Sequence, residues 1–160
     1  IGEARAAGWD AAGLLSPGVF INSEKVAIDA VDIRSGQEMR LAQRRRQTDT
    51  DLAFGDWFFN KHVLDWGNRI LESSLPCEML MVDELGPLEF NLSSGWVHAL
   101  DVIRAGHYLL AVVVIRPELL EQAREVLPPA QIIEINEREQ VRERIEQMVP
   151  ELKRLKPLDR

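Results

Sequence analysis

Cysteine, excess positive charge and long apolar runs are all scarce in this sequence. Cys77 is the only cysteine among 160 residues, so no intramolecular disulfide can form, and we expect a reducing, cytoplasmic location. The formal net charge is −7, which gives the chain no general attraction for nucleic acid or anionic membranes. No apolar run approaches the roughly 20 residues that a membrane-spanning helix needs. We therefore expect neither a specific nucleic acid nor a membrane as partner, although a local site can still bind phosphate.

Motifs of two common catalytic classes are also missing. The three histidines, His62, His98 and His107, show no ligand spacing to one another or to Cys77, which argues against a zinc site. No Gly-x-Ser-x-Gly sequence and no readable Ser-His-Asp arrangement occurs, which argues against a hydrolase of the triad type.

What is present is the pattern of a globular α/β protein. Hydrophobic residues make up 46% of the chain and charged residues 28%, and the length suits one domain over residues 1–160. In the second half, apolar runs closed by turn residues alternate with helical periodicity, which predicts parallel βα units. The expected strands are the run into Asp83, 108–115 and 131–135, and the expected helices are 60–74, Ser93 or Ser94 to Gly106, 117–127 and 136 onward. In the first half, we expect a helix end at 1–8, a strand at 11–15 and a small antiparallel meander at 19–21, 25–33 and 37–42.

One stretch combines a buried strand with adjacent carboxylates. The apolar run Met79–Val82 leads directly into Asp83 and Glu84, and Gly86-Pro87 then turns the chain. Ligands of an open parallel sheet collect at the carboxyl ends of its strands. The functional interpretation is a Walker B strand, in which Asp83 holds Mg²⁺ through water and Glu84 prepares the water that attacks the γ-phosphate. The alternative is a buried strand that ends in a solvated acidic turn.

Charged residues near this stretch have two possible roles each. Arg116 ends the neighbouring expected strand and would emerge on the same edge, where it could read γ-phosphate charge or simply extend into solvent. We expect Glu89 to face solvent, with pairing to a basic group as the alternative. The run Arg44-Arg45-Arg46 is either a solvated basic loop or a mobile loop that delivers an arginine to phosphate.

The aromatic cluster Phe54, Trp57, Phe58 and Phe59 is expected to belong to the core or to a hydrophobic lid, because such side chains bury large areas. A platform on which a nucleobase stacks is the other possibility.

The chain resembles the nucleoside-triphosphatase family of P-loop enzymes that includes the cancer-related nucleoside triphosphatase. The resemblance spans nearly all 160 residues. It is most specific in Val82-Asp83-Glu84-Leu85-Gly86-Pro87-Leu88-Glu89, which is similar to the Walker B signature of that family, and it extends to Ala12–Pro17 and Val26–Leu41. The Asn136-Glu137-Arg138 turn is also similar, so Asn136 is expected to bind nucleotide. The resemblance implies a RecA-like P-loop NTPase three-layer sandwich with a mostly parallel sheet plus the small antiparallel meander. It also implies Mg²⁺ as cofactor and hydrolysis of several ATP- and GTP-like substrates.

The sequence departs from this family in one essential part. No G-x-x-x-x-G-K-[ST] occurs in the 160 residues, so the backbone cradle, the lysine and the hydroxyl of a phosphate-binding loop are missing. Because the strand before that loop normally lies inside the sheet, its loss would leave unpaired backbone groups, and we expect a gap beside the Asp83 strand. We hypothesise that Ile1 lies just past the P-loop helix, with roughly thirty preceding residues missing.

Together with the acidic pair, the family resemblance implies Mg²⁺-dependent hydrolysis of nucleoside 5′-triphosphates with broad base tolerance. Asp83 would support the metal, Glu84 and Arg116 would be catalytic, and the chain without a P-loop would be nearly inactive. Two alternatives stay open. The chain is a non-catalytic protein-interaction domain on a P-loop scaffold, or it is a nucleotide kinase that transfers the phosphoryl group to an acceptor other than water.

Overall fold

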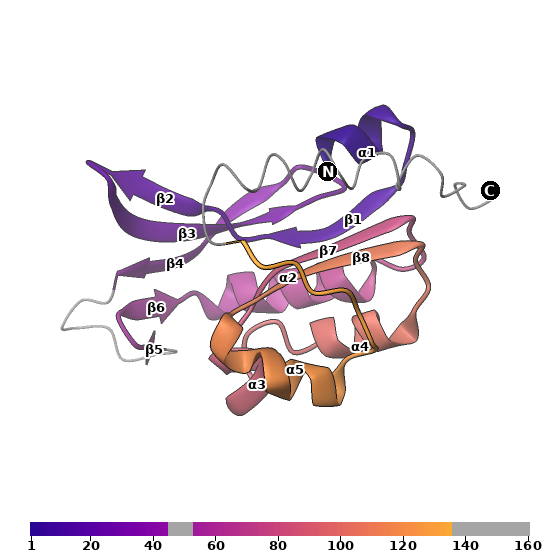
Figure 1. Cartoon of the computed structure of the whole chain (residues 1–160). Coiled ribbons are helices and arrows are strands. Elements are labelled where there is room, and N and C mark those ends of the chain that lie inside the picture. The colour runs from indigo at the N-terminus through magenta and orange to yellow at the C-terminus, as the bar shows by residue number, and fades with distance from the viewer. Residues whose placement is uncertain (45–52, 136–160) are drawn as a thin grey trace.

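The computed structural model describes residues 1–44 and 53–135, which form a layered α/β structure (Figure 1). Its helices are α1 (Gly2–Ala6), α2 (Lys61–Glu72), α3 (Pro87–Asn91), α4 (Ala99–Ala105) and α5 (Leu120–Val126), with a 3₁₀ turn, η1, at Pro117–Leu119. Its strands are β1 (Ala11–Leu15), β2 (Gly18–Ile21), β3 (Glu24–Asp32), β4 (Glu38–Arg44), β5 (Ala53–Phe54), β6 (Trp57–Phe59), β7 (Met79–Leu85) and β8 (Leu110–Ile115). Within the described ranges, no helix is long and apolar enough to cross a membrane.

The described strands join one sheet in the order β5-β6-β4-β3-β1-β7-β8, with β2 paired to β3. The strands β1, β7 and β8 are parallel, with Leu14 opposite Val82 and Val82 opposite Val113. From the β1–β3 pair outward the sheet is antiparallel. The α/β fold class is thereby confirmed, and the antiparallel part exceeds the expected meander because residues 53–59 add the hairpin β5–β6 beside β4.

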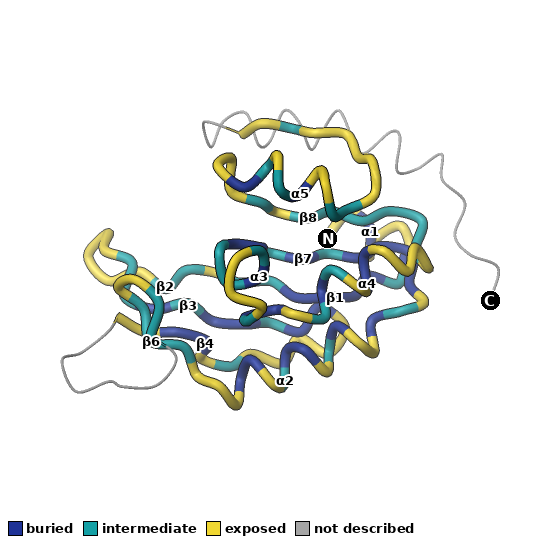
Figure 2. The backbone as a smooth tube through the Cα atoms, turned by 90° about the horizontal axis from the view of Figure 1, so that it is seen from below, coloured by how far each residue is buried: buried dark blue, intermediate teal, exposed yellow. Residues whose placement is uncertain are grey.

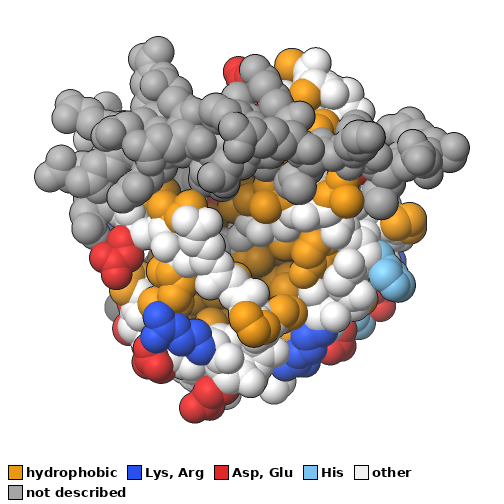
Figure 3. Space-filling model, turned by 45° about the vertical axis from the view of Figure 1, so that its right-hand side comes forward, with side chains coloured by type: hydrophobic (Ala, Val, Ile, Leu, Met, Phe, Trp, Pro, Cys, Tyr) orange, Lys and Arg blue, Asp and Glu red, His pale blue; other side chains and the backbone are white. Residues whose placement is uncertain are grey.

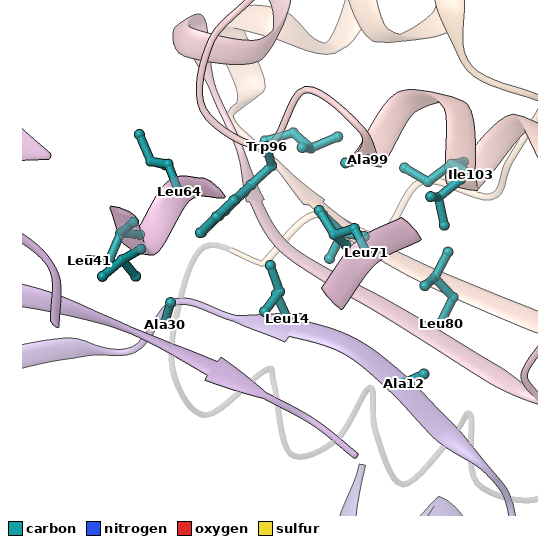
Figure 4. Packing of buried hydrophobic residues seen from close by; sticks show 14 of the residues in the cluster. Ala12, Leu14, Ala30, Leu41, Leu64, Leu71, Leu80, Trp96, Ala99 and Ile103 are labelled. Carbon is teal, nitrogen blue, oxygen red and sulfur yellow. The ribbon is translucent and has the colours of Figure 1, made fainter. Parts of the chain in front are cut away.

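The main core lies between the sheet and the helices that cover one of its faces (Figures 1 and 4). Leu14, Leu80 and Val82 from the parallel strands are fully buried against Leu71 of α2 and against Trp96. Along α2, buried residues alternate with exposed ones, as an amphipathic helix on a sheet requires (Figure 2). The expected N-cap of this helix is confirmed, since the Asn60 side chain accepts hydrogen bonds from the amides of His62 and Val63.

The opposite face of the sheet carries α1 and a smaller apolar cluster. Ala4, Trp9, Ala11, Ile33 and Met79 are buried there. Figure 3 shows a view in which hydrophobic side chains line a hollow of the surface, with acidic and basic side chains around its lower rim.

Two expected elements differ from the structure. Residues 93–98 form bends and turns, with Ser93 at a φ of 46°, so α4 begins at Ala99 rather than at Ser93 or Ser94. Residues 131–135 form no strand, and Ile132 and Ile135 are 42% and 53% exposed. A strand needs a hydrogen-bonded neighbour, and the sheet order ends at β8 without reaching this segment.

The sheet also has no gap beside the strand that carries Asp83. β7 pairs with β1 on one side and with β8 on the other, so our expectation of unpaired groups next to this strand is wrong. In the part of the chain that the structure describes, the sheet order ends at β5 and at β8. Any further strand that extends this order has to pair at one of those ends. Consistent with an outer position, β8 is only partly buried, and Val114 is 38% exposed.

Candidate functional site

The acidic pair and Arg116 meet at the carboxyl edge of the parallel strands. Asp83 and Glu84 lie near the carboxyl end of β7, just before its last residue, and the peptide bond between them is cis. Arg116 directly follows β8, the parallel neighbour of β7, and its Nε donates a hydrogen bond to Oε1 of Glu84. This contact raises the pKa of the Arg116 guanidinium, while burial opposes the change. The sequence thus placed these three residues on one edge, although it did not predict that the arginine would bind the glutamate.

Asp83 has a different environment from Glu84. Its Oδ2 accepts a hydrogen bond from the backbone amide of Ser16, at 3.2 Å, just beyond the end of β1. Burial raises the pKa of the Asp83 carboxyl, and the charge of Glu84 adds to this rise, whereas the Ser16 amide and the Lys25 ammonium lower it. No ion pair to Asp83 occurs within residues 1–44 and 53–135. One carboxylate is therefore neutralised by a cation, and the other is held by a single amide.

Glu89 shapes the loop that follows the acidic pair. Its carboxylate is buried, with 8% of the residue exposed, and it accepts hydrogen bonds from the amide of Gly86 at 2.8 Å and of Trp96 at 2.7 Å. Our expectation that Glu89 faces solvent is therefore wrong, because this side chain caps the first turn of α3 from inside the loop. Burial raises the pKa of the Glu89 carboxyl, and the two amides oppose that rise.

Asn68 of α2 holds the far end of the same loop. Its side-chain nitrogen donates to the carbonyls of Leu64 and Gly95, at 3.0 and 2.8 Å, and its oxygen accepts from the amide of His98 at 3.1 Å. Two buried polar side chains, Glu89 and Asn68, thus fix the loop between α3 and α4. Only the short helix α3 separates this loop from the strand that carries the acidic pair.

The other predicted residues lie away from this edge or outside the described residues. Arg44 ends β4 and pairs with Glu24 at 2.7 Å, with both side chains exposed. The aromatic segment forms part of the sheet, since Trp57 belongs to β6. The Lys25 ammonium lies over the Trp57 ring, with its nitrogen 5.5 Å from the ring centroid. Arg45, Arg46 and Asn136 lie outside the described residues.

The oxygen atoms at this edge fit a hydrated divalent cation better than a fully protein-bound one. Within the described ranges, no group of three or more His, Cys, Asp or Glu residues could hold a metal ion. Mg²⁺ usually binds one or two carboxylates and takes its remaining ligands from water and substrate phosphates. Asp83 supplies such a carboxylate. Ser16, whose backbone amide bonds Asp83, has a buried Oγ without a hydrogen-bond partner among the described residues.

Comparison with known proteins bears on the same elements. A family model described as NTPase matches residues 1–149, which is most of the chain. The chain belongs to this NTPase family. The crystal structure of THEP1 from the hyperthermophile Aquifex aeolicus is similar in fold, with a TM-score of 0.62 and 15% identity over 93% of this chain and 85% of that one. No curated protein matches the chain.

Membership of the NTPase family confirms the resemblance seen in the sequence, and the likeness to THEP1 confirms the fold. Sequence reasoning missed Ser16 and Lys25 as neighbours of Asp83. Ser16 directly follows the apolar run of β1. Its proximity to Asp83 depends on the register in which β1 pairs with β7, which the structure provides. Lys25 carried no signal, because its approach depends on the pairing of β3 with β1 in the sheet.

Proposed function

We propose that this edge is the metal-binding and water-activating half of a nucleoside-triphosphatase site. The observation that carries the proposal is the meeting of Asp83, Glu84 and Arg116 where two adjacent parallel strands end. Family membership supports nucleotide chemistry, and such a strand edge is where ligands of α/β sheets bind. The substrates that we propose are nucleoside triphosphates, with the broad base tolerance that the family resemblance implies.

Each residue has a distinct part in this proposal. Asp83, held by the Ser16 amide and free of ion pairs among the described residues, would hold Mg²⁺. When bound, this cofactor would neutralise charge that develops on the transferring phosphoryl group. Glu84 would orient a water molecule and accept its proton, and Arg116 would stabilise the phosphate oxygens. Because Arg116 now binds Glu84, both roles require that this ion pair opens when a triphosphate enters.

The remaining half of the site is a phosphate cradle, which this sequence does not contain. Such a cradle supplies backbone amides and a lysine that side chains elsewhere do not replace. Among the described strands the sheet order ends at β8, which leads into Arg116, and a strand that carries such a cradle could pair there. We therefore propose that the 160 residues alone bind triphosphates weakly and turn them over at a negligible rate.

A non-catalytic interaction domain is the second candidate, and the missing cradle is the observation that favours it. The deciding experiment measures Mg²⁺-dependent phosphate release from ATP and GTP. It compares the 160-residue chain with a product extended by any residues that the gene encodes before Ile1, each as wild type, Glu84→Gln and Arg116→Ala. Glu118→Gln, an exposed neighbour of Arg116, is the matched control.

Turnover is expected in the extended wild type and in the control. Loss of the base is expected to lower kcat by about 10²–10⁴-fold, and loss of the arginine by about 10²–10³-fold. If the extended wild type neither binds nor hydrolyses either nucleotide, the hydrolase proposal is refuted and the interaction domain is favoured.

A further inference from the structure

In the described part of the chain, Ser16, just beyond the end of β1, and Asp83 of β7 each carry an oxygen atom with open hydrogen-bonding capacity. Oγ of Ser16 is the one buried side-chain polar atom without a hydrogen-bond partner in the part of the chain that the structure describes. Its own backbone amide donates to Oδ2 of Asp83, so the hydroxyl and the carboxylate belong to one small cluster. The other carboxylate oxygen, Oδ1, has no hydrogen bond or ion pair among the described residues.

The charges around this cluster favour a cation at Asp83 rather than at Glu84. Arg116 already neutralises Glu84 through an ion pair. Lys25 lowers the pKa of Asp83 only through space and stacks over Trp57 instead of bonding the carboxylate. Asp83 thus keeps a largely uncompensated negative charge next to a hydroxyl that can donate or accept.

A buried hydroxyl without a partner is unfavourable, so its presence needs a reason. A packing role is one explanation, but alanine would fill a packing position without burying an unsatisfied oxygen. A second explanation is a partner that arrives with a ligand. A hydrated Mg²⁺ or Mn²⁺ ion keeps several water molecules, and such a water can bond a hydroxyl beside the coordinating carboxylate.

We propose that Ser16 is a positioning residue for a divalent cation, in which Asp83 binds the ion and the Ser16 hydroxyl bonds one of its water ligands. This inference rests on the metal-binding part of the proposed function and extends it to a residue that lies on another strand. The Ser16 amide fixes the carboxylate, and the Ser16 hydroxyl fixes the hydration shell. One residue at the end of β1 would therefore orient both the carboxylate ligand and a water ligand of the cation.

The test uses Mn²⁺ alone, without nucleotide, on the 160-residue chain. Electron paramagnetic resonance gives the free Mn²⁺ concentration and hence the dissociation constant, for wild type, Ser16→Ala, Ser16→Thr and Asp83→Asn. Ser74→Ala is the matched control, because Ser74 is also buried but its hydroxyl donates to the carbonyl of Ile70 at 2.8 Å. Thermal unfolding of each variant, with and without Mn²⁺, separates a role in binding from a role in stability.

Ser16→Ala is expected to weaken Mn²⁺ binding about tenfold, as loss of an outer-shell partner commonly does. Its melting temperature without metal should not fall, because no hydrogen bond is lost, and the gain in melting temperature with Mn²⁺ should shrink. Ser16→Thr should bind like wild type, Asp83→Asn should lose binding, and Ser74→Ala should bind normally but melt earlier.

Three results would overturn the inference. These are wild-type affinity in Ser16→Ala, undiminished binding in Asp83→Asn, and no Mn²⁺ binding by wild type at millimolar concentration. The outcome is independent of catalysis: normal Mn²⁺ behaviour together with absent turnover refutes only the hydrolase proposal. If the extended chain turns over triphosphate but Ser16→Ala binds Mn²⁺ with wild-type affinity, only the role of Ser16 is refuted.

Discussion

Removal of the Glu89 carboxylate is expected to be among the most destabilising single changes in the chain. In Glu89→Ala the amides of Gly86 and Trp96 lose their acceptor at a position where Glu89 is 8% exposed. Each unsatisfied buried amide costs about 1–3 kcal/mol, so the loss of unfolding free energy should be about 2–6 kcal/mol. A domain of this size is stable by about 5–15 kcal/mol, which makes the effect large but measurable.

The conservative variant tests the reasoning more sharply. Glu89→Gln keeps one acceptor oxygen and presents a donor to the other amide, so it should lose roughly half as much as Glu89→Ala. Urea unfolding followed by tryptophan fluorescence measures both, with the exposed Glu125→Gln as control, where a change within about 0.5 kcal/mol is expected. If Glu89→Ala changes the unfolding free energy no more than this control, the carboxylate does not hold the loop.

Three further changes test other parts of the structure. Burial raises the pKa of Asp83 above its ordinary value of 3.8, so ionisation of this carboxyl disfavours the folded state. The stability of Asp83→Asn relative to wild type should therefore increase as pH rises from about 3 to 7. A stability difference that stays constant with pH in urea unfolding would contradict this. Gly67→Ala places a methyl group 2.3 Å from a ring carbon of Trp96, and the overpacking of about 1–3 kcal/mol should outweigh the gain of about 1 kcal/mol in helix propensity, so a higher urea midpoint would refute the packing described. Arg34→Lys cannot keep the two-point contact with Asp10, and it should lose about 1–2 kcal/mol in the same assay, whereas exposed Arg69→Lys should lose almost nothing.

Local pattern was enough to predict the strand that carries Asp83 and the helix capped by Asn60. Both depend on signals that lie within a few residues: an apolar run closed by a turn, and a side chain that caps the next amides. The position of Arg116 at the same edge as the acidic pair also followed, because parallel neighbours end at the same edge. These inferences need no knowledge of distant contacts.

Two of the failures concern residues whose state depends on a partner that the local pattern does not reveal. Residues 131–135 have strand composition, yet they form no strand because no described neighbour pairs with them. The residues around Glu89 have the composition of a solvated turn, yet its carboxylate is buried and accepts a hydrogen bond from the amide of Trp96, seven residues later. Nothing in the local sequence near Glu89 distinguishes a buried cap from an exposed one.

The contrast between the two adjacent carboxylates bears directly on how such a site divides its chemistry. Glu84 is half-exposed and bound to the guanidinium of Arg116, so its charge is compensated in this structure. A polyphosphate carries more negative charge than one carboxylate, so it can compete with Glu84 for Arg116. Asp83 is more buried and lacks such a partner among the described residues, so its charge stays available for a cation. A ligand that carries both a divalent cation and phosphate oxygens would satisfy both demands at once, whereas either component alone would satisfy only one. For this reason we expect the metal alone to bind at Asp83 while Arg116 stays bound to Glu84, and we place the release of Glu84 at the arrival of the metal–triphosphate complex.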